Sequence, residues 1–200
     1  LGPERVTTTE LGYLWQNREN NWLLDIKLFV EEVDDAIDEY RVPALDLVDA
    51  LANEHRNVAR WRTKGLELQW QLQPWQHTWF HLAYAYADTN GQHDEGSGKL
   101  QILDQRVPTH TVALLGRHDF GNRLQGSVGF YRQTSVDWKG GANLAPYERL
   151  DVRLEKGFSS PAGEGSVELL VQNLLPSYRE FDANNNFDTR AFLRMNLSFL

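Results

Sequence analysis

The chain has 200 residues, of which 41% are hydrophobic and 24% are charged, and its formal net charge is -8 at pH 7. This acidic balance argues against nucleic acid as a partner, because phosphate binding requires concentrated lysine and arginine. No apolar run is long enough for a membrane helix, which excludes a helical inner-membrane protein but not a β-barrel. The absence of cysteine excludes a disulfide scaffold and any thiolate metal site.

The start of the chain lacks the features of a complete precursor. It opens Leu1-Gly2-Pro3-Glu4, and the only methionine is Met195. Neither an initiator nor a signal peptide with a basic segment before an apolar one is present. We therefore expect the sequence to be a processed or truncated piece of a longer protein.

Strand-like segments with turn signals recur along the chain, and no long amphipathic helix is evident. The sequence predicts about nine strands, at 7–17, from 22, at 65–73, at 80–87, at 110–120, from 124, around 150–155, from 167 and at 191–199. Long polar connections are expected at 32–57, where 43–52 could form a short helix, and at 88–108. A two-residue hairpin signal predicts a turn at Gly121-Asn122.

The stretch GLELQWQLQP at 65–74 shows the strand pattern most clearly. Leu66, Leu68, Trp70 and Leu72 share one face, because successive side chains of a strand point to opposite faces. In a soluble sandwich this face would point into the core, whereas in an outer-membrane barrel it would point into lipid. The strand alone does not decide between the two.

Two wider regularities favour lipid. Short connections follow the first, third, fifth and seventh predicted strands and long ones follow the others, as in outer-membrane barrels with brief periplasmic turns and extended outer loops. Aromatic residues also gather near predicted strand ends, where interfacial girdles occur, although such residues favour strands in general. The residues concerned are Tyr13, Trp15, Trp22, Trp61, Trp75, Trp79, Trp138 and Tyr147.

Four segments together resemble the barrel of TonB-dependent outer-membrane receptors. The opening LGPERVTTTELGY at 1–13 is similar to the pattern L-x-P-E-x-x-x-x-x-E-L-G-Y. VQNLLPSY at 171–178 is similar to the pattern v-x-N-L-x-d-x-x-Y of the penultimate strand. The segments KGLEL at 64–68 and YERLDVRL at 147–154 agree in order and spacing. The set spans nearly the whole chain.

The resemblance implies an all-β fold, in which the chain is the C-terminal portion of an antiparallel, up-and-down transmembrane β-barrel of roughly 22 strands. Residues 1–200 would be a single partial domain without the N-terminal plug domain. An odd number of strands would leave the first one starting outside the cell, so at least one strand is expected before Leu1. Open edges would leave unpaired backbone groups in lipid, so the chain alone is not expected to form a pore.

The resemblance also implies a function, a location and partners. The function would be energised uptake of a scarce ligand, such as an iron-siderophore complex or cobalamin, across the outer membrane of a Gram-negative cell. The partners would be outer-membrane lipid and lipopolysaccharide, the barrel-assembly machinery, the TonB system through the missing plug, and a small-molecule ligand such as a ferric chelate. Phe199, which is followed by Leu200, would supply the terminal aromatic residue of the assembly signal.

One group of residues is a candidate ligand contact. Arg60, Arg62 and Lys64 form a basic row on one face, just before the apolar part of their strand, and could hold an anionic ligand at the outer rim. The alternative is polarity that balances nearby acids. No metal or cofactor is expected, because His77 and His81 would lie about 13 Å apart on a strand. No nucleophile is fixed beside a base, so no enzyme activity is expected.

Two other functions stay open at this point. A passive porin-like barrel would have the same strands but no plug. A soluble Trp-rich β-sheet domain that binds carbohydrate would use the same apolar rows as its core. The upstream sequence would separate the first from a receptor, and solubility without detergent would identify the second.

Overall fold

The computed structural model describes residues 1–17, 19, 21–42, 52–93, 107–138, 142–161, 163–179 and 185–199. No helix within these ranges is long and apolar enough to cross a membrane. Every regular element in them is a β-strand, which confirms the predicted all-β class.

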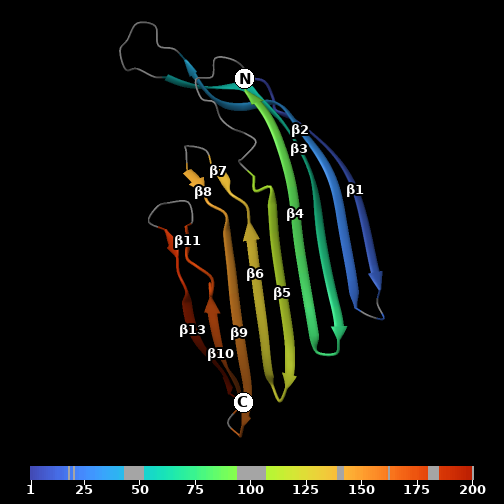
Figure 1. Ribbon diagram of the computed structural model, residues 1–200, viewed down its shortest axis with the longest axis vertical. Helices are drawn as coiled ribbons and strands as arrows, with labels where there is room; N and C mark the ends of the chain where they lie inside the picture. Colours follow the sequence, from blue (N-terminus) through green and yellow to red (C-terminus); the bar gives the residue numbers. More distant parts are fainter. Residues whose placement is uncertain are drawn as a thin grey trace.

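Nine long strands form one antiparallel sheet, in which each strand pairs with the next one along the chain. They are β1 (Arg5–Asn17), β2 (Trp22–Val42), β3 (Ala52–Trp75), β4 (Thr78–His93), β5 (His110–Gly121), β6 (Leu124–Gln133), β9 (Tyr147–Ser160), β10 (Gly163–Gln172) and β13 (Arg190–Phe199). Figure 1 shows them side by side as a curved sheet. The predicted up-and-down arrangement of about nine strands is confirmed.

Two small hairpins interrupt the long connections. β7 (Val136–Trp138) pairs with β8 (Ala142–Leu144) between β6 and β9. β11 (Tyr178–Arg179) pairs with β12 (Asn186–Phe187) between β10 and β13. Both hairpins lie at the end of the sheet opposite the short turns (Figure 1), so the predicted alternation of short and long connections holds.

The turn between β5 and β6 shows how a short connection is built. Gly121 pairs with Leu124, which leaves Asn122 and Arg123 as the two turn residues. Their φ angles are 50° and 60°, as in the type I′ turn that suits the twist of a hairpin. The predicted turn at Gly121-Asn122 is therefore one residue too early, because Gly121 still pairs in β5.

The loop predicted at 32–57 is wrong for much of its length. β2 continues to Val42, and β3 begins at Ala52. The short helix considered at 43–52 falls outside the described residues, except that Ala52 already belongs to β3.

The loop predicted at 88–108 needs the same correction, because β4 runs on to His93. These strand extensions have no apolar alternation, and the sequence prediction depended on that alternation. They are held instead by the backbone ladder, in which Asp38 lies opposite Arg56. Polar strand ends of this kind carry hydrogen bonds between strands but no hydrophobic signal.

A bulge and a small buried cluster mark the place where β2 and β3 leave the apolar part of the sheet. The pairing register shifts between Val33 and Ala36, and Asp35 has a φ of 55°. Val33, Ala36 and Ala59 are buried, and Trp61 packs against them. A β-bulge bends its strand and increases the local twist, which agrees with the change of direction of β2 and β3 in Figure 1.

Candidate functional site

The pairing register brings the apolar residues of all nine long strands to one side of the sheet. Leu28 lies opposite Leu66, which lies opposite Tyr86, and Leu169 lies opposite Leu193. Directly paired residues point to the same side. We call this side the apolar face; its members include Leu11, Tyr13, Leu24, Ile26, Leu66, Leu68, Leu82, Leu114, Phe130, Leu150, Val152, Val167, Met195 and Leu197.

The centre of the apolar face carries no aspartate, glutamate, lysine or arginine on the described strands. On β2 this charge-free band runs from Trp22 to Val30, about 26 Å at about 3.3 Å per residue. Outer-membrane barrels carry an outward apolar band about 25 Å tall. Leu11 is 69% exposed and Leu193 is 77% exposed. An apolar surface that extends over nine strands is far larger than a water-soluble monomer exposes.

Tryptophan side chains border this band at the short-turn end of β1 to β3. The rings of Trp15 and Trp22 meet edge to face with centroids 6.3 Å apart, and those of Trp22 and Trp70 with centroids 6.2 Å apart. This row fits the aromatic girdle expected from the sequence. Trp61, Trp79 and Tyr147 do not belong to the girdle, because they pair with Val33, Arg117 and Gln133 on the opposite side of the sheet.

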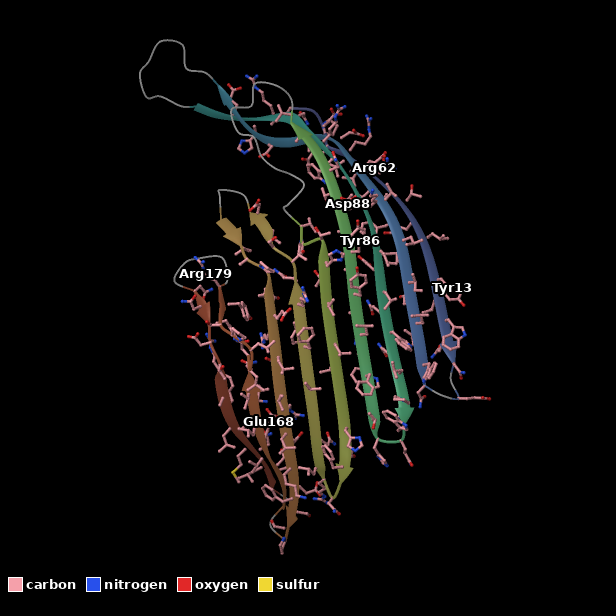
Figure 2. All side chains as sticks on the ribbon, viewed as in Figure 1. Tyr13, Arg62, Tyr86, Asp88, Glu168 and Arg179 are labelled. Atoms are coloured by element: carbon pink, nitrogen blue, oxygen red, sulfur yellow. The ribbon has the colours of Figure 1, made fainter. Side chains whose placement is uncertain are left out.

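The opposite side, which we call the polar face, carries charges in its centre. On β1, β2 and β3, the Lys27 ammonium lies 3.7 Å from a carboxylate oxygen of Glu10 and 2.8 Å from one of Glu67. Lys27 lies directly opposite Glu67 and diagonally across from Glu10, which pairs with Phe29, so a single lysine bridges acids on both neighbouring strands. Figure 2 shows the side chains of the sheet projecting to both sides.

The densest charge cluster of the polar face lies on β9, β10 and β13. Arg153 Nη2 lies 2.6 Å from Glu155 and 2.7 Å from Glu168, and Arg194 lies 3.4 Å from Glu168. Glu168 is only 5% exposed. The sequence does not predict this cluster from the apolar rows of these strands, but the period-two charges from Arg149 to Glu155 are a visible signal of it.

The end of β10 is tied to the polar face by a fully buried residue, Asn173. Its backbone N–H donates to Asp151 Oδ1 at 2.9 Å, and its side-chain amide donates to the Phe187 carbonyl at 2.8 Å. Its own carbonyl accepts from the Thr189 hydroxyl at 2.6 Å. Asn173 has a φ of 53°, a left-handed conformation that asparagine tolerates better than most residues. The β11–β12 hairpin is thereby fixed against β9.

Aromatic stacking and cations reinforce the same hairpin. The rings of Tyr147 and Tyr178 stack with centroids 4.5 Å apart, and Tyr178 stacks on Phe187 at 5.3 Å. The guanidinium groups of Arg149 and Arg190 lie 4.8 Å and 4.3 Å from the centroid of the Phe187 ring. Cations over a ring face are attracted by its quadrupole. The connection between β10 and β13 is therefore ordered where it meets the sheet.

The candidate ligand row Arg60, Arg62 and Lys64 lies on β3 beyond the charge-free band, toward the long connections. Arg62 and Lys64 continue the apolar face, because their registers align them with Glu32 and Asp88. Lys64 Nζ lies 3.0 Å from Asp88, and Arg62 Nε lies 3.4 Å from Glu32. Figure 2 places Arg62 and Asp88 in the half of the sheet away from the short turns. Acids thus balance Arg62 and Lys64.

The two histidines and the terminal phenylalanine considered in the sequence lie apart from the basic row. His77 occupies the β3–β4 turn, whereas His81 lies within β4. Within the described ranges, no three histidine or acidic residues come together as a metal site. Phe199 is the last residue of β13 and pairs with Gly163.

A curved, up-and-down sheet with a continuous apolar face and a charged opposite face is the wall of a membrane-type β-barrel. The family described as TonB dependent receptor-like, beta-barrel matches residues 1–174 of the chain. The chain therefore belongs to this family. No curated protein sequence matches it significantly.

Solved structures agree on the fold. The ferric-catecholate import receptor Fiu from E. coli K12, in its closed form, is similar with a TM-score of 0.70 and 16% sequence identity, over 97% of this chain and 27% of that one. BauA, the ferric preacinetobactin receptor from Acinetobacter baumannii, is similar with a TM-score of 0.67 and 15% identity, over 98% of this chain and 29% of that one. This chain thus spans less than a third of either receptor.

Proposed function

We propose that this chain is the C-terminal part of the barrel wall of an outer-membrane receptor that imports a scarce ligand, with a ferric chelate as the first candidate. Membership of the receptor-barrel family supports the receptor class. The charge-free band on the apolar face supports its placement in lipid, because charged side chains there would cost about 2–4 kcal/mol each. The polar face would then line the barrel interior, where a plug domain supplied by the rest of the receptor would pack.

The energy source and ligand extend this proposal beyond the chain itself. Uptake would be driven through TonB acting on the plug, and cobalamin is the second ligand class. Two similar structures are named as ferric-chelate receptors, which supports iron before cobalamin. The barrel-assembly machinery and lipopolysaccharide would be further partners. No covalent chemistry is assigned to any residue.

The test is uptake by the intact receptor in a Gram-negative host that lacks its own ferric-chelate receptors. Radiolabelled iron supplied as catecholate and hydroxamate chelates, and labelled cobalamin, would be compared with and without TonB. We expect uptake of one chelate that disappears when TonB is deleted. Uptake that persists without TonB would instead identify a passive porin-like pore. Receptor recovered in the soluble fraction would favour the carbohydrate-binding alternative.

Arg62 and Lys64 continue the outward, apolar face and do not line the barrel interior, so we propose the basic row as a contact for an anionic ligand at the outer rim, with a limited effect. Arg62 is paired with Glu32 and Lys64 with Asp88, and both ion pairs are exposed and therefore of modest strength. An anionic chelate would compete with these two acids for the two cations. Replacing Arg60, Arg62 and Lys64 together by glutamine is expected to weaken chelate binding by about threefold to tenfold, within the range of a surface charge effect. Unchanged affinity in the intact receptor would remove this proposal.

A further inference from the structure

A groove crosses the apolar face near the short turns of β4, β5, β6 and β9. It has a volume of about 460 Å³. Its walls include Phe80, His118, Phe120, Val152 and Leu154. The lining is almost entirely apolar, and it lies within the part of the sheet that the proposed function places in lipid.

Two glycines, Gly116 and Gly126, line the groove. A Cβ at Gly116 would approach Phe80 Cε1 to 3.0 Å, and a Cβ at Gly126 would approach Phe120 Cε2 to 3.0 Å. The Phe120 ring also meets His118 edge to face at 4.6 Å. The two glycines therefore give room to the Phe80 and Phe120 rings, which lie over them and border the groove. Any other residue at Gly126 would push the Phe120 ring out of this place.

Beyond the short-turn end of this groove the apolar face carries a cation, Lys156. Lys156 pairs with Leu124 and with Val167, which places it on the apolar face, two residues beyond Leu154 toward the short turn. Its ammonium donates to the Asn122 carbonyl at 2.5 Å. Within the described residues, no carboxylate lies at ion-pair distance from it, and an ammonium has three donors. Two donors therefore point away from this one protein partner.

The neighbouring acids do not compete for Lys156, because they belong to the other side of the sheet. Glu155 and Asp119 lie on the polar face, in register with Gln125. Arg123, in the adjacent turn, is paired with Glu164 at 3.3 Å. The apolar face therefore combines the apolar groove with one positive charge, Lys156, on the side of the short turns.

We propose that this groove binds one acyl chain of a membrane phospholipid, with the lipid phosphate at Lys156. The inference rests on the membrane placement proposed above. On β9 the groove is lined by Val152 and Leu154, and Lys156 lies about 13 Å from Val152 along the strand at about 3.3 Å per residue, so an acyl chain in the groove and a headgroup at Lys156 fit one lipid. Charge complementarity selects an anionic headgroup, and on the described strands of this chain the apolar face near the short turns carries no aspartate or glutamate that a second copy could bring to Lys156.

The experiment uses the intact receptor, purified from membranes in a mild detergent and titrated with phosphatidylglycerol. Native mass spectrometry counts the lipids retained per receptor. Wild type is expected to retain one lipid that survives dilution. Lys156→Gln is expected to weaken its retention about tenfold, the size of one lost charge-assisted hydrogen bond. Gly126→Val, which forces the Phe120 ring from its place at the groove, is expected to abolish lipid retention.

Matched controls separate the groove from general effects. Arg132→Gln removes a cation at the other end of the apolar face, where Arg132 pairs with Glu148. Gly12→Val adds a side chain where a Cβ meets nothing within 4 Å. Both controls should retain the lipid as wild type does. The proposal would be overturned if Arg132→Gln lost as much lipid as Lys156→Gln, or if Gly12→Val lost as much as Gly126→Val. It would also be overturned if Lys156→Gln and Gly126→Val retained the lipid fully.

Failure of this inference can be told apart from failure of the proposed function. A receptor that imports its ligand but retains no phosphatidylglycerol overturns the lipid site alone. A receptor pair held together through the groove, seen as a dimer that Gly126→Val dissociates, also overturns it and makes a second copy the occupant. A receptor absent from the membrane fraction overturns the membrane placement and the lipid site with it.

Discussion

Arg153 and Glu168 form a two-bond contact across β9 and β10. Arg153 Nε donates to Glu168 Oε2 at 2.8 Å, and Nη2 lies 2.7 Å from the same oxygen. The Glu168 side chain is 7% exposed, whereas that of Arg153 is 34% exposed. The acid is therefore the buried partner, and its second oxygen faces Arg194 on β13. One carboxylate thus links three successive strands of the sheet.

Removing this acid should destabilise the barrel. Glu168→Gln is expected to lower the free energy of unfolding of the intact receptor by about 1–3 kcal/mol, because two guanidinium groups lose their charged partner in a site of low exposure. The measurement is denaturant unfolding in detergent. Glu10→Gln is the control, since the Glu10 side chain is 51% exposed and exposed pairs contribute little. Equal effects of the two changes would contradict the assignment.

A charge on the apolar face should cost more than the same charge on the polar face. Leu68→Arg is expected to destabilise the receptor in phospholipid vesicles by about 2–4 kcal/mol, the cost of arginine near the bilayer midplane. Gln69→Arg, one residue away on the polar face, is expected to cost less than 1 kcal/mol, because it stays in contact with water. Reversible unfolding from vesicles measures both. Similar costs would show that the faces are assigned wrongly.

Asn173 provides a test of backbone conformation and buried hydrogen bonding. Asn173→Gly keeps the left-handed conformation but loses the bond to the Phe187 carbonyl, whereas Asn173→Ala also adds strain of about 1 kcal/mol. Both variants should unfold at lower denaturant concentration than wild type. Alanine should be the more harmful of the two. If the glycine and alanine variants unfold at the same denaturant concentration, the left-handed conformation contributes nothing to stability beyond the hydrogen bond.

Phe199 tests the assembly signal that the family resemblance implies. Phe199→Ala in the intact receptor is expected to reduce the amount of folded barrel in the outer membrane severalfold. Phe199→Tyr, which keeps the aromatic ring, should restore it. Quantitative blotting of outer-membrane fractions measures both variants, with Phe192→Ala on the same strand as the control. Normal assembly of Phe199→Ala would exclude Phe199 as the signal.

The faces of the strands were predictable from sequence because alternation is a local property of an extended backbone. Leu66, Leu68 and Trp70 share a face in any strand that contains them. The segments that resemble the receptor family were equally readable, and the family match covers residues 1–174. The lengths of β2 and β3 were not readable, because their polar ends carry no alternation and depend on pairing with each other.

The sequence by itself determined an all-β chain with one apolar and one polar row on each strand. Only the tertiary structure decided which rows meet, because register depends on partners distant in sequence. It joined the apolar rows of nine strands into one face, and it brought Glu168 between Arg153 and Arg194. It also placed Gly116 opposite Val128 and Gly126 opposite His118 in one apolar groove, and it put Lys156 two residues beyond Leu154 on the same face.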